Sequence, residues 1–209
     1  FYKYRSMFST PIPEDDAERL ATLYRYAILD TPSEEAYEDV TALAAYICAT
    51  PYSTITLVDA DRQWFKSEVG FGTNETSRGD GFCACALLNP KPLIVEDTLK
   101  DSRFADNPFV VNEPKIRFYA GAPLIAPNGQ ILGTVCVFDT KPRILKNEQI
   151  SALISLSRQV MALFAARLRR LESDRAAAAL LQNEKLAAVG RLASSMAHSI
   201  NNPLESITN

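Results

Sequence analysis

The residue best suited to chemistry is His198, the only histidine among 209 residues. It lies in residues 184–209, where apolar side chains recur at steps of four and three, a spacing that predicts a helix. These apolar residues are Val189, Ala193, Met196 and Ile200. His198 lies two positions from the last two of them, so its side chain is expected to project off the apolar stripe towards solvent. An exposed imidazole on a rigid helix is a nucleophile that a partner can reach. The alternative is a surface histidine with no chemical role.

The string around this histidine favours the chemical interpretation. It reads His198-Ser199-Ile200-Asn201-Asn202-Pro203-Leu204, and it resembles the phospho-acceptor box of sensor histidine kinases, H-E-x-x-N-P-L. The resemblance implies that His198 accepts the γ-phosphate of ATP and passes it to an aspartate of a response regulator. The protein is therefore expected to be part of a protein-histidine kinase.

Two positions of the string bear on the rate of this chemistry. The family usually has an acidic residue after the histidine, which helps to polarise the imidazole. Here that position is Ser199, whose hydroxyl cannot serve as a carboxylate base near neutral pH, so slow autophosphorylation is expected. Asn202 lies four residues after His198, on the same side of the helix. The resemblance implies a phosphatase role for Asn202, in which it orients water towards the regulator's phospho-aspartate.

ATP and Mg²⁺ are expected to be cofactors of the parent kinase and not to bind this chain. The chain contains no P-loop, and it contains no glycine-rich ATP lid after the histidine string. Because it starts without methionine and stops inside a helical pattern, it is expected to be a fragment. Residues 1–7 are expected to be a non-native or disordered start.

The segments that precede the His198 helix are predicted to change from helices to strands near Pro51. Two helices are predicted before it, and the second is expected to start at Thr31-Pro32-Ser33-Glu34, with Thr31 as the cap and Glu34 completing a capping box. After Pro51, segments rich in β-branched residues alternate and are joined by hairpin signals as far as residue 138. The pattern predicts the α+β class: an antiparallel sheet flanked by helices.

Several strings in this region resemble bacterial GAF sensor domains, over roughly residues 8–165. The longest are Ile28-Leu29-Asp30-Thr31-Pro32, Arg62-Gln63-Trp64-Phe65-Lys66-Ser67, Asp101-Ser102-Arg103-Phe104-Ala105-Asp106-Asn107-Pro108 and Ile116-Arg117-Phe118-Tyr119-Ala120-Gly121-Ala122-Pro123-Leu124. The resemblance implies a GAF-like sensor domain, which we assign to residues 8–146.

A single long helix is predicted from residue 147, because no proline occurs between Pro142 and Pro203. Its apolar residues alternate at steps of four and three, the period of a coiled coil. This seam contains Ile150, Ile154, Ser157, Met161, Phe164, Leu168 and Leu171. We expect a coiled-coil linker over residues 147–184 and, over 185–209, the first helix of a helical-bundle dimerisation and phosphotransfer domain. From this seam we expect a parallel homodimer formed through residues 147–200.

The sensor domain is expected to offer a ligand pocket whose ligand the sequence leaves open. The candidate lining residues are Phe82, Cys83, Cys85, Arg117, Phe118 and Tyr119. Core packing is the alternative role for the aromatic residues. A bilin is disfavoured, because bilin-binding relatives attach the pigment through a cysteine commonly followed by histidine, and no such pair occurs here. Cys83-x-Cys85 supplies too few ligands for zinc, so no metal site is expected.

The composition narrows the class of protein. The net charge of −3 and the pI of about 5.3 do not favour nucleic acid or an anionic membrane as a partner. No membrane-spanning run is recognised, so a cytoplasmic location is expected. The four cysteines lie in apolar strings and are expected to be buried, inert thiols. The alternative function is a non-catalytic dimeric module that senses a ligand or a redox signal, with a degenerate acceptor helix.

Overall fold

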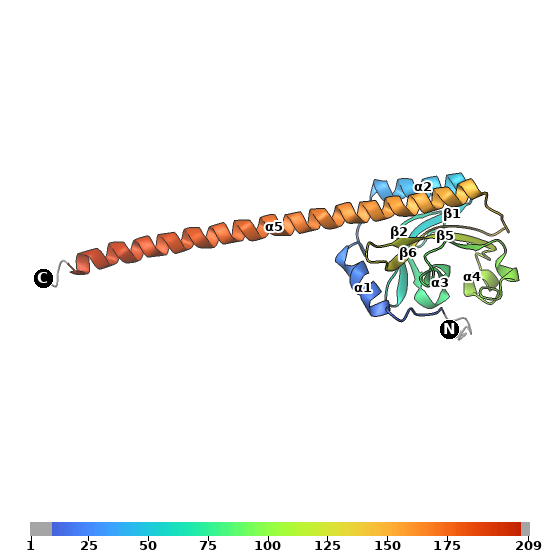
Figure 1. The fold of residues 1–209 in the computed structure, drawn as a ribbon, viewed down its shortest axis with the longest axis horizontal. Helices are drawn as coiled ribbons and strands as arrows, with labels where there is room; N and C mark the ends of the chain where they lie inside the picture. Colours follow the sequence, from blue (N-terminus) through green and yellow to red (C-terminus); the bar gives the residue numbers. More distant parts are fainter. Residues whose placement is uncertain (1–9, 206–209) are drawn as a thin grey trace. The chain divides into compact units, whose positions relative to one another are not determined.

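The protein, described here by a computed structural model over residues 10–205, contains one six-stranded antiparallel sheet (Figure 1). The strand order is β3-β2-β1-β6-β5-β4, which places β1 and β6 side by side at the centre. The strands are β1 (Tyr52–Val58), β2 (Arg62–Val69), β3 (Glu75–Ser77), β4 (Leu93–Val95), β5 (Phe118–Ile125) and β6 (Ile131–Asp139). The α-helices are α1 (Asp16–Arg25), α2 (Glu35–Cys48), α3 (Phe82–Ala86), α4 (Pro108–Val111) and α5 (Asn147–Glu205). Among the described residues there are also two 3₁₀ turns, η1 (Arg78–Asp80) and η2 (Thr98–Lys100). The predicted α+β class and the long final helix are confirmed.

The two faces of the sheet are covered by different helices. Figure 1 shows α2 and the start of α5 on one side, and α3 and α4 on the other. On the first face the Thr41 hydroxyl of α2 lies 2.7 Å from the Ser67 hydroxyl of β2. Ser67 is in turn the cross-strand partner of Ile55 in β1. On the second face Cys83 of α3 contacts Cys136 of β6. Antiparallel pairing keeps cross-strand partners on one face, so each face is fixed by the strand register.

The start of α2 differs from the predicted one. The helix begins at Glu35, and the side chain of its N-cap residue, Glu34, makes no cap hydrogen bond. Instead Nζ of Lys66, whose side chain is fully buried, donates to Thr31 Oγ1 (2.9 Å), the carbonyl of Pro32 (2.7 Å) and the Glu34 carboxylate (2.6 Å). A buried ammonium must be paired and hydrogen-bonded. The predicted capping groups therefore bind Lys66, a tertiary contact that the local sequence does not reveal.

The beginning of α5 belongs to the core of the sensor domain. Leu153, Val160 and Phe164 are buried against it. The Phe164 ring lies between those of Tyr26 and Tyr37, with centroid distances of 5.6 and 5.8 Å. This aromatic triad, Tyr26–Tyr37–Phe164, attaches the helix to the segments that precede β1.

Some residues of the predicted coiled-coil seam therefore pack within their own domain, and the others stay accessible to a second chain. Ser157 and Phe164, both assigned to the seam, are buried in their own domain and cannot contact a second chain. The other seam positions are half-buried: Ile150, Ile154, Met161, Leu168 and Leu171. The sequence pattern missed this because a helix packed on a sheet and a helix packed on another helix show the same apolar spacing.

One stretch, Asn147–Leu186, meets the length and composition criteria for a membrane-crossing helix, with a window of mean hydropathy 1.3. Buried core helices of globular domains meet the same criteria. Because Val160 and Phe164 in this stretch are fully buried in the sensor domain, the finding is weak evidence for a membrane span.

Candidate functional site: a buried thiol pair

The short helix α3 places Phe82 and Cys83 on the second face of the sheet. The ring of Phe82 stacks on that of Tyr119 in β5, with centroids 5.1 Å apart and planes 14° apart. On its other side Phe82 contacts Phe104, at 4.9 Å. These rings fix α3 over the middle of the sheet, so the next residue, Cys83, points at β6.

The two sulfur atoms of Cys83 and Cys136 lie 3.7 Å apart, and both side chains are buried. The Tyr119 hydroxyl donates a hydrogen bond to Cys83 Sγ at 3.3 Å. Cys136 Sγ lies 3.0 Å from the hydroxyl of Thr54 and 3.9 Å from that of Thr56. The result is a compact polar cluster inside an apolar layer.

The register of the sheet explains why these groups meet. Thr54 pairs with Cys136, and Thr56 pairs with Thr134, across β1 and β6. Gly121 in β5 lies opposite Cys136 on the other side. A Cβ atom at Gly121 would overlap the Tyr119 hydroxyl, so glycine leaves the space that this hydroxyl occupies.

The surroundings give the two thiols different acidities. Burial raises the pKa of Cys136 well above its ordinary value, and the neighbouring sulfur raises it further. Burial also acts to raise the pKa of Cys83, but hydrogen bonds from Cys136, Tyr119 and nearby threonine hydroxyls outweigh it and lower this pKa to about 6. The two pKa shifts have opposite directions, which favours Cys83 over Cys136 as the thiol that ionises first.

This acidity departs from the inert thiols expected from the sequence. Burial raises the pKa of Cys48 and of Cys85 to about 11 each, as expected. Cys83 differs because hydroxyl and thiol donors surround it, whereas the apolar string in the sequence suggested an apolar environment.

A cavity of about 40 Å³ adjoins the thiol pair, and its lining includes five phenylalanine side chains. Its volume matches one or two water-sized molecules and is far below the ~300–1,000 Å³ of ordinary ligand pockets. Gln63 also lines it. The Nε2 of Gln63 donates to Thr76 and to the carbonyl of Ser77, while its buried Oε1 finds no partner among the described residues. That oxygen can accept a hydrogen bond from a small guest.

The six predicted lining residues do not form one pocket. Phe82, Cys83 and Tyr119 come together at the cavity. Phe118 alternates with Tyr119 along β5 and so lies on the opposite face, where it is fully buried. Arg117 instead binds Asp97, at 2.8 Å, and does not line the cavity.

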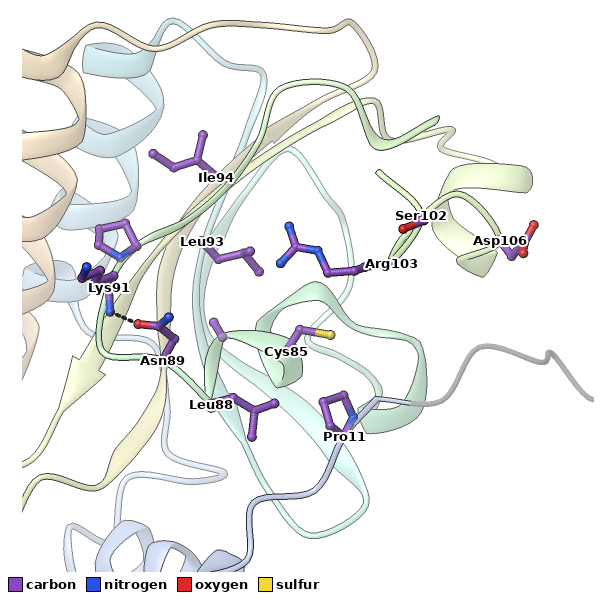
Figure 2. Close-up of a pocket in the computed structure, with 12 residues that line it drawn as sticks. Pro11, Cys85, Leu88, Asn89, Lys91, Leu93, Ile94, Ser102, Arg103 and Asp106 are labelled. Carbon is purple, nitrogen blue, oxygen red and sulfur yellow. Dashed lines mark hydrogen bonds between the residues drawn. The ribbon is translucent and has the colours of Figure 1, made fainter. Parts of the chain in front are cut away.

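Cys85 lines a different, surface hollow of about 770 Å³, shown in Figure 2. Leu93 and Arg103 also face this hollow. Arg103 is already paired with Asp101, at 2.6 Å, and is more than half exposed. The hollow therefore lacks a buried polar group that would orient a ligand.

The predicted catalytic residues lie at the far end of α5. The backbone of His198, Ser199 and Asn202 is helical, and the helix continues past Pro203 to Glu205. Their side chains lie outside the described residues, so their predicted roles stay predictions. Among the described residues, no group of three or more His, Cys, Asp or Glu side chains is suited to a metal ion.

Sequence reasoning missed Cys136, Thr54 and Thr56. Strand alternation signals that the two threonines share a face. Nothing local indicates that this face meets Cys136, because that contact spans 82 residues.

A family model described as the GAF domain matches residues 25–164. The chain is 40% identical over 157 residues to a cyclic di-GMP phosphodiesterase of Pseudomonas aeruginosa. That match covers 75% of this chain, which spans only 27% of the length of the relative.

The fold is shared with solved structures of other proteins. The GAF domain of an Acinetobacter phosphoenolpyruvate-protein phosphotransferase superposes with a TM-score of 0.54 at 17% identity, covering 74% of this chain and 95% of that one. A domain of a putative two-component sensor histidine kinase from Sinorhizobium meliloti gives a TM-score of 0.51 at 20% identity, covering 68% and 96%. At these identities the likeness shows the fold and not the activity.

Proposed function

The chain belongs to the GAF domain family, and on that premise we propose that it is the sensory part of a cytoplasmic sensor histidine kinase. In this proposal the parent enzyme uses ATP and Mg²⁺ to phosphorylate His198. The phosphate then passes to an aspartate of a response regulator. The second partner is another copy of the chain, bound through residues 147–200.

The proposal rests on the resemblance of the His198 string to a phospho-acceptor box and on the continuity of that string with the sensory domain. A single helix, α5, begins in the core of the sensory domain and continues through the His198 string to Glu205. At its start the Tyr26–Tyr37–Phe164 triad fixes the helix to the domain. Packed interfaces have discrete arrangements, so a change in the domain core shifts or rotates such a helix as a unit.

A second candidate is favoured by the 40% identity to a cyclic di-GMP phosphodiesterase. In that case α5 carries the signal to a different effector, and His198 has no role in phosphate transfer. The two candidates share the sensory domain and the helix, and they differ in the chemistry of the whole protein.

The deciding experiment incubates the whole protein with γ-labelled ATP and Mg²⁺, and separately with cyclic di-GMP. The kinase proposal expects acid-labile phosphate that His198→Gln abolishes and the matched control Ser195→Ala keeps. Phosphate that persists in His198→Gln, or hydrolysis of cyclic di-GMP without any phosphorylation, would refute the kinase and leave the second candidate.

A further inference from the structure

We propose that Cys83 and Cys136 are an oxidation site: a small hydroperoxide enters the adjoining cavity and converts the two thiols into an intramolecular disulfide. The inference concerns the sensory domain itself and holds for either effector. It rests on the geometry of the pair, the size of the cavity and the hydrogen bonds around the sulfurs.

The geometry favours this pair over the other thiols. The sulfurs are in van der Waals contact at 3.7 Å and need to approach by about 1.7 Å to reach the ~2.0 Å of a disulfide. Cys136 lies in β6 at the centre of the sheet, and Cys83 lies in α3, a helix of five residues packed over it. Cys85 lines the surface hollow, away from the pair.

The cavity selects the oxidant by size. About 40 Å³ accommodates hydrogen peroxide, which is little larger than water, but excludes a branched alkyl hydroperoxide or glutathione. The unpaired Oε1 of Gln63 offers the guest a hydrogen-bond acceptor. We therefore expect this buried thiol pair to react faster with small peroxides than with larger thiol reagents.

The reaction balances with hydrogen peroxide as the sole oxidant. Cys83 first releases its proton to solvent, and its thiolate attacks one peroxide oxygen, so that an S–O bond forms and the O–O bond breaks. The leaving hydroxide takes up one proton from solvent, equal to the one that Cys83 released, and becomes water. Cys136 sulfur then attacks the resulting sulfenic acid. The S–S bond forms, the S–O bond breaks, and the second hydroxide leaves as water with the Cys136 proton. Two thiols and one peroxide give one disulfide and two waters.

The hydrogen bonds assign the order of these steps. Tyr119 donates to Cys83 Sγ at 3.3 Å and stabilises its thiolate, and the lowered pKa of Cys83 agrees with this assignment. Cys136, whose pKa is raised, stays protonated until Cys83 has been oxidised. Cys83 is therefore the attacking thiol and Cys136 the resolving thiol.

The main test treats the whole chain with a small excess of hydrogen peroxide, blocks the remaining thiols under denaturing conditions, and maps the peptides by mass spectrometry. The expected product is a Cys83–Cys136 cross-link with a loss of two hydrogens. A background with Cys48→Ser and Cys85→Ser should give the same product. Absence of this cross-link, or a cross-link to Cys85 in the unmutated chain, would overturn the proposal.

Two further measurements separate the built site from chance oxidation. tert-Butyl hydroperoxide should react at least about tenfold more slowly than hydrogen peroxide, since it does not fit the cavity. Tyr119→Phe should slow the hydrogen peroxide reaction by about tenfold through loss of one hydrogen bond to the thiolate. Equal rates with both peroxides would mean that the thiols react in an opened chain, and the proposed site would be wrong.

A variant with Cys136→Ala checks the order of attack. Cys83 should then gain oxygen and form no intramolecular disulfide. If Cys136 gains the oxygen in the reciprocal Cys83→Ala variant at the same rate, the assignment of Cys83 as the attacking thiol is wrong. The fluorescence of Trp64, the single tryptophan, shows whether each variant is folded.

Discussion

Replacing Phe164 should separate α5 from the sensory domain. The Phe164 side chain is fully buried and lies between the rings of Tyr26 and Tyr37. Truncating a buried phenylalanine to alanine typically costs about 3–5 kcal/mol, from lost apolar burial and the cavity left behind. We therefore expect Phe164→Ala to lower the free energy of unfolding by about 3–5 kcal/mol, a large share of the total stability of a domain.

A graded series distinguishes the sources of this loss. Phe164→Leu keeps most of the apolar volume and loses two aromatic contacts, each worth roughly 0.5–1.5 kcal/mol, so its expected cost is about 1–3 kcal/mol. Leu180→Ala, at a position 66% exposed on the same helix, is the matched control and should change stability by less than about 0.5 kcal/mol.

The assay is urea unfolding followed by the fluorescence of Trp64, the single tryptophan, which is buried in β2. This signal reports on the sheet and not on helix content, so fraying of α5 beyond the domain does not contribute. A cost below about 1 kcal/mol for Phe164→Ala would refute the reasoning, because the triad would then not hold the helix. Equal costs for Phe164→Ala and Phe164→Leu would refute the role given to cavity formation.

Three further outcomes are expected. Leu168→Glu together with Leu171→Glu should dissociate the proposed homodimer, as seen by light scattering, because two buried charges per chain cost more than the seam provides. Ser199→Glu should raise the autophosphorylation rate of the whole protein by about 10²-fold or more, measured as acid-labile phosphate; an unchanged rate would contradict the assigned base position. Asp16 accepts hydrogen bonds from Arg78 that lower its pKa below the ordinary 3.8. Its contribution to stability is therefore present above about pH 4 and is lost as the pH falls through the lowered folded value. Asp16→Asn should accordingly cost about 3 kcal/mol at pH 7 in urea unfolding, with the difference from the unmutated chain shrinking below pH 4.

Local sequence determined the kinds of elements in this protein. The helix from Asn147 follows from the absence of helix breakers and from the apolar spacing, and the hairpin strands follow from alternation and turn residues. The α+β class could be predicted because both signals act over a few residues. The assignment of the His198 string uses the same kind of local information, in consecutive positions, and it stays a prediction.

The tertiary structure alone decided the candidate site and the packing of α5. Cys83 meets Cys136 only because β1, β5 and β6 pair in one register and Gly121 leaves room for Tyr119. The lowered pKa of Cys83 depends on hydrogen-bond donors from three separate strands, and the apolar string around it in the sequence does not indicate them. The role of Phe164 was also hidden in the sequence, because the spacing of apolar residues around it fits a coiled coil as well as a helix packed on a sheet. Both arrangements bury the same stripe, and only the position of the sheet distinguishes them.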